Sequence, residues 1–181
     1  MSLKTLISAD CTASTVYKSI RKKYTNPITN VFIKIDEYIK LIENYDTLNF
    51  DNFKPIINPD DISDYDKQVF KYNILIDDKV FISFPYECDE KLMIEKYLRR
   101  LERYKSKEYE IVFVFTQREY VTEEDLMKFI NVKTNHKKIL FTKIKELEKY
   151  NTDNLSIIYD DAPSWGSIIK CCTKVCDILQ I

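Results

Sequence analysis

The stretch Glu110-Ile-Val-Phe-Val-Phe-Thr116 indicates the class of fold. A continuous apolar run of this kind is typical of a β-strand that is covered on both faces. Shorter apolar runs at Leu3–Ser8, Lys138–Thr142 and Leu155–Tyr159 predict further strands, and segments with helical patterns lie between them. Strands interleaved with helices predict an α/β protein, with a layered α/β/α arrangement around a mixed sheet.

Turn and capping residues assign most of the other segments. Asp77-Asp78 separates the apolar runs Tyr72–Ile76 and Lys79–Phe84, which predicts a hairpin although no glycine supports its turn. Thr122, with Asp125 three residues later, predicts a capping box at the start of a helix. We also expect a strand at Ile28–Ile35, a loop at Phe50–Asp66, and helices at Ser14–Lys22, from Asp36 to Tyr45, from Asp89 to Lys105, at Lys143–Tyr150 and, after a Ser164 cap, at Trp165–Leu179.

Glycine is almost absent from this chain. Gly166 is the only glycine among 181 residues, whereas average usage would give roughly 13. Phosphate-binding loops and the turn of a dinucleotide-binding fold need several glycines, because the backbone must approach the phosphates closely. The composition therefore excludes these nucleotide-binding loops.

Charge and length narrow the class of protein further. The 28 Lys and Arg residues nearly cancel the 29 Asp and Glu residues, so no overall field would attract nucleic acid. No apolar run approaches the roughly 18 residues of a membrane span. The length predicts one globular domain over residues 1–181. Five cysteines without an export signal predict reduced thiols in the cytoplasm. With one histidine and no paired Cys-x-x-Cys set, neither a structural zinc nor a cofactor is expected.

Two residues are candidates for catalysis. Cys11 lies between a predicted strand and a predicted helix, and a helix N-terminus lowers the pKa of a cysteine and so favours a nucleophile. The alternative is that Cys11 is simply a small buried residue at the end of a strand. His136 is the only imidazole that could serve Cys11 as a base. It lies in a polar stretch before a strand, so the alternative for His136 is a solvated loop residue.

Acidic residues offer weaker candidates. Asp160-Asp161 follows a predicted strand, where a glycosyltransferase can place metal-binding aspartates, but a cap or turn explains the pair more simply. The aspartates Asp60, Asp61, Asp64 and Asp66 could bind a hard cation, yet no glycine allows the tight loop that this needs. A solvated acidic loop is the preferred interpretation of that segment.

Five short blocks, in a fixed order, carry a family resemblance. They are Leu6–Cys11 with Val16–Lys18, Asn26–Ile28 with Val31–Ile33 and Asp36–Asn44, Glu95–Arg100, Thr122–Asp125, and Lys138–Thr142. Together they resemble the family called domain of unknown function 1919, over residues 5–145 with a divergent tail at 146–181. Bacterial members of that family are often labelled exopolysaccharide biosynthesis proteins and have a layered α/β fold.

The resemblance implies a protein associated with exopolysaccharide biosynthesis that acts on a saccharide or acyl substrate. Cys11 is kept in the first block, which implies a hydrolase or transferase with a cysteine nucleophile. Two departures favour the alternative, a non-catalytic binding or scaffold protein of the same fold. Val80–Tyr86 has no histidine where the family has histidines, and Gln117–Val121 lacks the family's acidic pair, glycine and cysteine.

Overall fold

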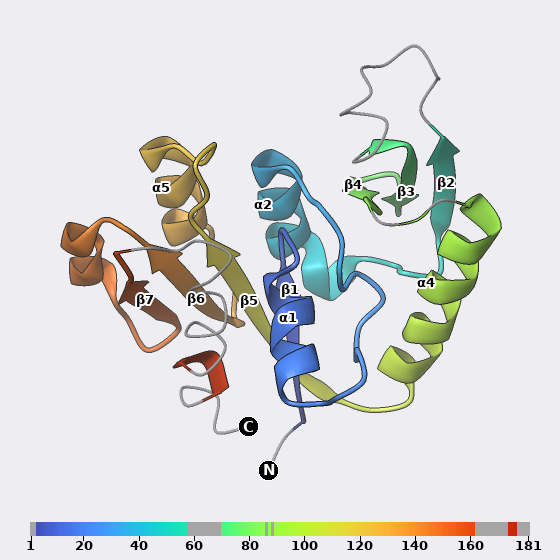
Figure 1. Cartoon of the computed structure of the whole chain (residues 1–181), viewed down its shortest axis with the longest axis horizontal. Coiled ribbons are helices and arrows are strands. Elements are labelled where there is room, and N and C mark those ends of the chain that lie inside the picture. Colours follow the sequence, from blue (N-terminus) through green and yellow to red (C-terminus); the bar gives the residue numbers. More distant parts are fainter. Residues whose placement is uncertain (1–2, 58–69, 86, 88, 162–173, 177–181) are drawn as a thin grey trace.

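The computed structural model describes residues 3–57, 70–85, 87, 89–161 and 174–176 (Figure 1). A four-stranded sheet runs through it in the order β1-β5-β6-β7, and every neighbouring pair is parallel. The carboxyl ends of all four strands therefore lie at one edge of the sheet, and the amino ends lie at the other. The strands are β1 (Leu3–Ser8), β5 (Tyr109–Thr116), β6 (Lys137–Thr142) and β7 (Leu155–Tyr159), so the four strands expected from these apolar runs are confirmed.

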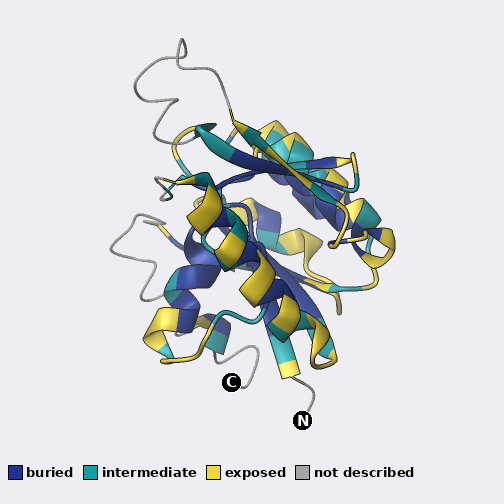
Figure 2. Ribbon diagram, turned by 90° about the vertical axis from the view of Figure 1, so that its right-hand side faces the viewer, coloured by how far each residue is buried: buried dark blue, intermediate teal, exposed yellow. Residues whose placement is uncertain are grey.

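Helices cover both faces of this sheet. Alternate residues of a strand point to opposite faces, so each face presents its own set of side chains for a helix to cover. On one face, Leu6 and Val112 pack against α1. On the other face, Ile7 and Phe113 belong to the larger core, which includes apolar side chains of α2 and α5. The strands are thus buried between helical layers (Figure 2), and the layered α/β/α prediction is confirmed. The three helices are α1 (Thr12–Ser19), α2 (Ile35–Asn44) and α5 (Glu123–Asn131).

A second sheet is antiparallel and adjoins the larger core. Its order is β2-β3-β4, and α4 packs against it. Ile74 and Ile82 from its strands and Tyr97 from α4 are buried in the same core as Phe113. The α/β class is confirmed, although parallel and antiparallel pairing lie in two separate sheets and not in the one mixed sheet that was expected. The elements are β2 (Phe53–Ile57), β3 (Tyr72–Ile76), β4 (Val80–Ser83) and α4 (Glu90–Lys105).

The hairpin between β3 and β4 is confirmed, and its turn contains no glycine. Asp77 and Asp78 both have a φ of 53°. Two successive residues with positive φ match the twist of the flanking strands, and asparagine, aspartate and glycine tolerate this conformation best. Asn30 (φ 62°) and Arg21 (φ 53°) also have left-handed backbone.

Two predictions are wrong, one of a strand and one of a loop. Ile28–Ile35 forms no strand and contributes one isolated bridge, between Phe32 and Ser83. Its alternating apolar residues are buried in the core without a ladder, so the period-2 pattern reflects burial alone. Phe50–Asp66 is not entirely a loop, because β2 pairs with β3. Pro55 is compatible with this because β2 lies at the edge of its sheet.

The helices agree with the sequence except at their ends. Asp89 caps α4 by accepting a hydrogen bond from the Leu92 amide, as expected. Helix α2 begins at Ile35 with Lys34 as N-cap, so Asp36 lies in the first turn and does not cap the helix. Helix α1 ends at Ser19, and the segment expected to be helical near residue 147 is a 3-10 helix, η2 (Lys145–Tyr150). Of the expected final helix, residues 174–176 are helical, and the rest, with Gly166, lies outside the described residues.

Within the described ranges, every helix is too short or too polar to cross a bilayer.

Candidate functional site

The carboxyl edge of the parallel sheet gathers polar residues from two strands that are far apart in the sequence. Asp10 follows β1, and Arg118 follows β5. Ligands of open α/β sheets bind outside the carboxyl ends of the strands, where loops can diverge and leave a crevice. This edge is therefore the first place to look for a site.

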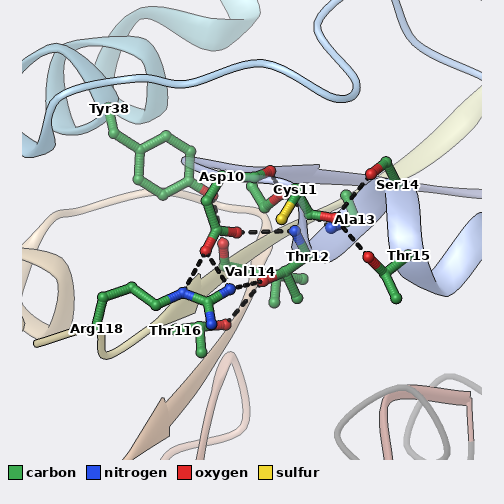
Figure 3. A network of polar contacts seen from close by, with 11 residues as sticks. Asp10, Cys11, Thr12, Ala13, Ser14, Thr15, Tyr38, Val114, Thr116 and Arg118 are labelled. Carbon is green, nitrogen blue, oxygen red and sulfur yellow. Dashed lines mark hydrogen bonds and ion pairs between the residues drawn. The ribbon is translucent and has the colours of Figure 1, made fainter. Parts of the chain in front are cut away.

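An ion pair joins these two strand ends (Figure 3). Arg118 donates from Nε at 2.8 Å and from Nη2 at 2.6 Å to Oδ2 of Asp10. The amide of Thr12 donates to Oδ1 of Asp10 at 2.8 Å. The side chains of Arg118 and Asp10 are only 11% and 15% exposed, so water screens the pair weakly. The carboxylate is consequently fixed in position at the edge.

Buried hydroxyl groups hold the strand ends on which this pair depends. The hydroxyls of Thr12 and Thr116 lie 3.1 Å apart, which ties the start of α1 to the end of β5. Tyr38 of α2 directs its hydroxyl at the carbonyl oxygens of Ile7 (2.7 Å) and Val114 (3.1 Å). One tyrosine of α2 thereby contacts both β1 and β5 near their carboxyl ends.

Cys11 lies beside this pair but is not activated. It is the N-cap of α1, its side chain makes no capping bond, and it is buried. Burial, followed by the negative charge of Asp10, raises the pKa of the Cys11 thiol to about 11, although Arg118 opposes the shift. The direction is opposite to that expected for a nucleophile at a helix start. The favourable helix field is outweighed because the thiol is desolvated next to a carboxylate.

His136 lies at the other edge of the sheet. It precedes β6, and its Nε2 lies 2.7 Å from Oδ1 of Asp46 in η1 (Tyr45–Thr47). Its ring also packs edge-on against Tyr45 and Phe113. The six residues of β6 separate His136 from the carboxyl edge, a rise of about 20 Å. The structure therefore does not bring Cys11 and His136 together.

A pocket of about 290 Å³ opens at the carboxyl edge, next to the ion pair. One part of its wall is apolar, and three aromatic residues contribute to it, including the highly exposed Tyr120. Another part carries the carboxylates of Asp10, Asp36 and Asp125. The N-termini of α2 and α5 border the opening. Its lining is Ala9, Asp10, Phe32, Ile33, Lys34, Ile35, Asp36, Phe115, Thr116, Tyr120, Val121 and Asp125.

A larger pocket of about 630 Å³ lies at the amino edge. The buried Lys138 lines it and donates to the carbonyl oxygens of Phe129 (3.0 Å), Ile130 (2.7 Å) and Val132 (2.8 Å). These are orphan carbonyls at the end of α5, and the ammonium satisfies them. Burial lowers the pKa of Lys138 to about 8, so the group is still mainly protonated at neutral pH.

The acidic candidates gain no support as a metal centre. Asp160 is buried after β7, and its amide donates to the Thr142 carbonyl at 2.9 Å, which extends the sheet pairing. Among the described residues, no group of three His, Cys, Asp or Glu side chains could hold a metal ion. The acidic segment with Asp60, Asp61, Asp64 and Asp66 lies outside the described residues, as do Cys88, Cys171 and Cys172. Cys176 is partly buried and packs against the apolar cluster that contains Val16 of α1.

Sequence reasoning missed Arg118 and the aromatic wall. Arg118 was seen only as part of a segment that departs from the family pattern. Its position directly after a buried strand, with Asp10 directly after another, was a signal that could have paired them. Phe32 and Tyr120 gave no signal, because they are far apart in sequence and lie in non-helical segments.

Fold and site together define a layered α/β protein with a ligand-sized pocket at the carboxyl edge of its parallel sheet. The chain belongs to the family described as domain of unknown function (DUF1919), whose model matches residues 2–168. The match runs beyond residues 5–145, so it includes part of the tail that was expected to diverge. Among curated proteins, none matches the chain significantly.

Proposed function

We propose that the chain is a saccharide-binding protein and that one sugar unit occupies the pocket at the carboxyl edge. The observation that carries this proposal is the composition of the pocket wall, in which Phe32, Phe115 and Tyr120 line the same cavity as three carboxylates. A sugar ring has apolar C–H faces and a rim of hydroxyl groups. Such a ring needs both an aromatic surface and fixed hydrogen-bond acceptors, and the pocket supplies both.

Asp10 is the acceptor that the site holds most firmly. Its carboxylate is fixed from two sides, by Arg118 and by the Thr12 amide. A polar group that is already oriented loses little conformational entropy when a ligand binds. Asp10 therefore binds a sugar hydroxyl, and Arg118 is the residue that positions it. The labels given to the family's members, which refer to exopolysaccharide, agree with a saccharide as the ligand.

Amide chemical shifts of the isotope-labelled chain test this proposal. Neutral and acidic oligosaccharides are added in turn, and the amides of Ile35, Tyr120 and Val121 are expected to shift, because these residues line the pocket. The amides of Asn131 and Thr152, at the amino edge, serve as the internal control and should not move. Shifts confined to the amino edge, or none with any saccharide, would overturn the proposal.

A second candidate function is a hydrolase or transferase in which Cys11 attacks an acyl or glycosyl group. Its support is the placement of a free Cys11 thiol at the N-cap of α1, beside Asp10 and within the influence of Arg118. A thiol with a pKa of about 11 is almost entirely protonated at neutral pH, and thiolate is the reactive form. His136 lies at the other edge and does not serve as its base. The binding function therefore has the better support, and a reduced thiol suits a cytoplasmic setting.

Alkylation by iodoacetamide separates these two functions. With the pKa raised from 9 to about 11, Cys11 should react at neutral pH about a hundredfold more slowly than in the urea-unfolded chain. Its rate should increase about tenfold per pH unit until the pH approaches 11, because the thiolate fraction rises in that proportion. Labelling of Cys11 ahead of the other cysteines at pH 7 would favour the enzyme.

A further inference from the structure

We infer that the pocket selects an uncharged sugar over sugars that carry a carboxylate, a phosphate or a nucleotide. This inference rests on the proposed function and specifies the class of saccharide. It begins from the three carboxylates of the lining, Asp10, Asp36 and Asp125, with Lys34 as the one cationic residue among the described residues of the wall. A ligand that occupies the pocket lies nearer to carboxylates than to cations.

Each carboxylate is already matched by a cation of the protein. Arg118 pairs with Asp10 at 2.6 Å. Lys128 of α5 lies 3.0 Å from Asp36 and 3.8 Å from Asp125. Lys128 also lies 3.8 Å from Glu124. With Lys34, three cations therefore face four carboxylates among these described groups, and the surroundings have no positive excess to attract an anion. An anion would lose hydration and face three carboxylates, whose repulsion is costly at close range.

The acceptor positions that remain on the carboxylates of the wall also favour a ligand that donates hydrogen bonds. Oδ2 of Asp125 accepts from the Thr122 amide (3.0 Å) and hydroxyl (2.8 Å) in the predicted capping box, which is confirmed. Among the described residues, Oδ1 of Asp125 has only the distant Lys128 as a partner, and Oδ1 of Asp36 takes the closer Lys128 contact. The other oxygens can accept further hydrogen bonds. Sugar hydroxyls donate, whereas a carboxylate or phosphate only accepts.

The size of the pocket agrees with this class. At about 290 Å³, the pocket is at the lower limit of the roughly 300–1,000 Å³ that ligand pockets usually span. One sugar ring fits this volume better than a nucleotide sugar with its diphosphate. The near absence of glycine also leaves no phosphate loop in the chain.

A panel of small probes tests the inference with the full chain. Methyl glucoside, methyl galactoside and methyl mannoside are titrated beside glucuronic acid, glucose 1-phosphate, UDP-glucose and glucosamine at neutral pH, with the Tyr120 amide as reporter. At least one neutral glycoside should bind tenfold or more tightly than every anionic probe. An anionic probe that binds equally well or better overturns the selectivity and leaves saccharide binding intact. If no saccharide shifts the amide, the proposed function fails as well.

Two matched pairs of variants locate the selectivity. Tyr120→Ala should weaken the neutral glycoside at least fivefold, whereas Tyr150→Ala, also an exposed tyrosine but at the amino edge, should not. Asp36→Asn should raise the affinity for glucuronic acid about threefold relative to the neutral glycoside. Asp46→Asn, which changes a comparably exposed aspartate of the amino edge, should leave that ratio unchanged. An effect of Tyr150→Ala equal to that of Tyr120→Ala would place the ligand in the other pocket and overturn the inference.

Discussion

The two edges of the parallel sheet differ in the hydrogen-bonding capacity that their charged groups retain. At the amino edge, the larger pocket is lined by Lys138, whose three hydrogens are all donated to carbonyls of the protein. At the carboxyl edge, the smaller pocket is lined by carboxylates that keep acceptor positions after their internal partners are counted. Volume alone would favour the amino edge as the binding site, but the remaining hydrogen-bonding capacity favours the carboxyl edge.

The comparison also separates stabilisation from recognition. A buried cation that satisfies orphan carbonyls holds a helix end in place, and it has no hydrogen left to donate to a ligand. A carboxylate held by an arginine is equally fixed but can still accept a hydrogen bond. Changes at the amino edge should thus alter stability without altering ligand binding, whereas changes at the carboxyl edge should alter both.

The largest effect is expected from Lys138→Met. The substitution keeps the length and apolar character of the stem but leaves three carbonyls at the end of α5 without their donor. At about 1 kcal/mol for each lost hydrogen bond, the free energy of unfolding should fall by about 3 kcal/mol. Urea denaturation at pH 7 measures this change.

The neighbouring Lys137→Met is the control, because Lys137 is exposed and pairs only with the Glu110 carboxylate at 3.4 Å. It should change the free energy of unfolding by less than about 1 kcal/mol. Glycoside binding should survive Lys138→Met under conditions where the variant is folded. Loss of binding in the folded variant would show that the amino edge takes part in recognition and would break the comparison.

Asp10→Asn should have the next largest effect and should act on both properties. It removes the charge that receives both Arg118 donors and leaves a mostly buried guanidinium without its counter-ion. We expect a loss of about 2 kcal/mol of unfolding free energy together with at least tenfold weaker glycoside binding. Asp46→Asn at the amino edge, where the carboxylate is 63% exposed, should cost less than about 1 kcal/mol and leave binding intact. If the two variants lost equal amounts of unfolding free energy and of glycoside affinity, the assignment of the binding site to the carboxyl edge would be contradicted.

His136→Gln should have the smallest effect. His136 contributes one contact with an exposed carboxylate and edge-on packing against two aromatic rings. Loss of these contacts should lower the free energy of unfolding by about 1 kcal/mol. The rate of Cys11 alkylation should not change, because the two residues lie at opposite edges. Slower alkylation in this variant would indicate that His136 does serve Cys11 as a base.

Sequence reasoning succeeded where one local pattern determined the structure. The apolar run of β5 identified a strand buried on both faces, and Thr122 with Asp125 identified the start of α5 through a capping box that the structure contains. Both signals act over a few residues. The segment Ile28–Ile35 shows the limit, since alternating burial without pairing produces the same pattern as a strand.

The candidate site was only half visible in the sequence. The position of Cys11 between a strand and a helix was predicted correctly, but its protonation depends first on burial, which local spacing does not describe, and then on the adjacent Asp10. Arg118 lies 108 residues from Asp10 in the chain, so its role depends on the pairing of β1 with β5. Long-range contacts of this kind need the sheet order, and the sequence alone does not provide it.

The glycine-free hairpin has a consequence for engineering the protein. Asp77 and Asp78 both adopt left-handed backbone, a conformation that costs a side-chain-bearing residue roughly 1 kcal/mol and glycine almost nothing. Asp77 recovers part of this cost through contacts with Lys79 and Asn52, whereas the exposed Lys54 is the one side chain of the described part of the chain that binds Asp78. Position 78 is thus the place where a designer could thermostabilise the molecule with one added glycine.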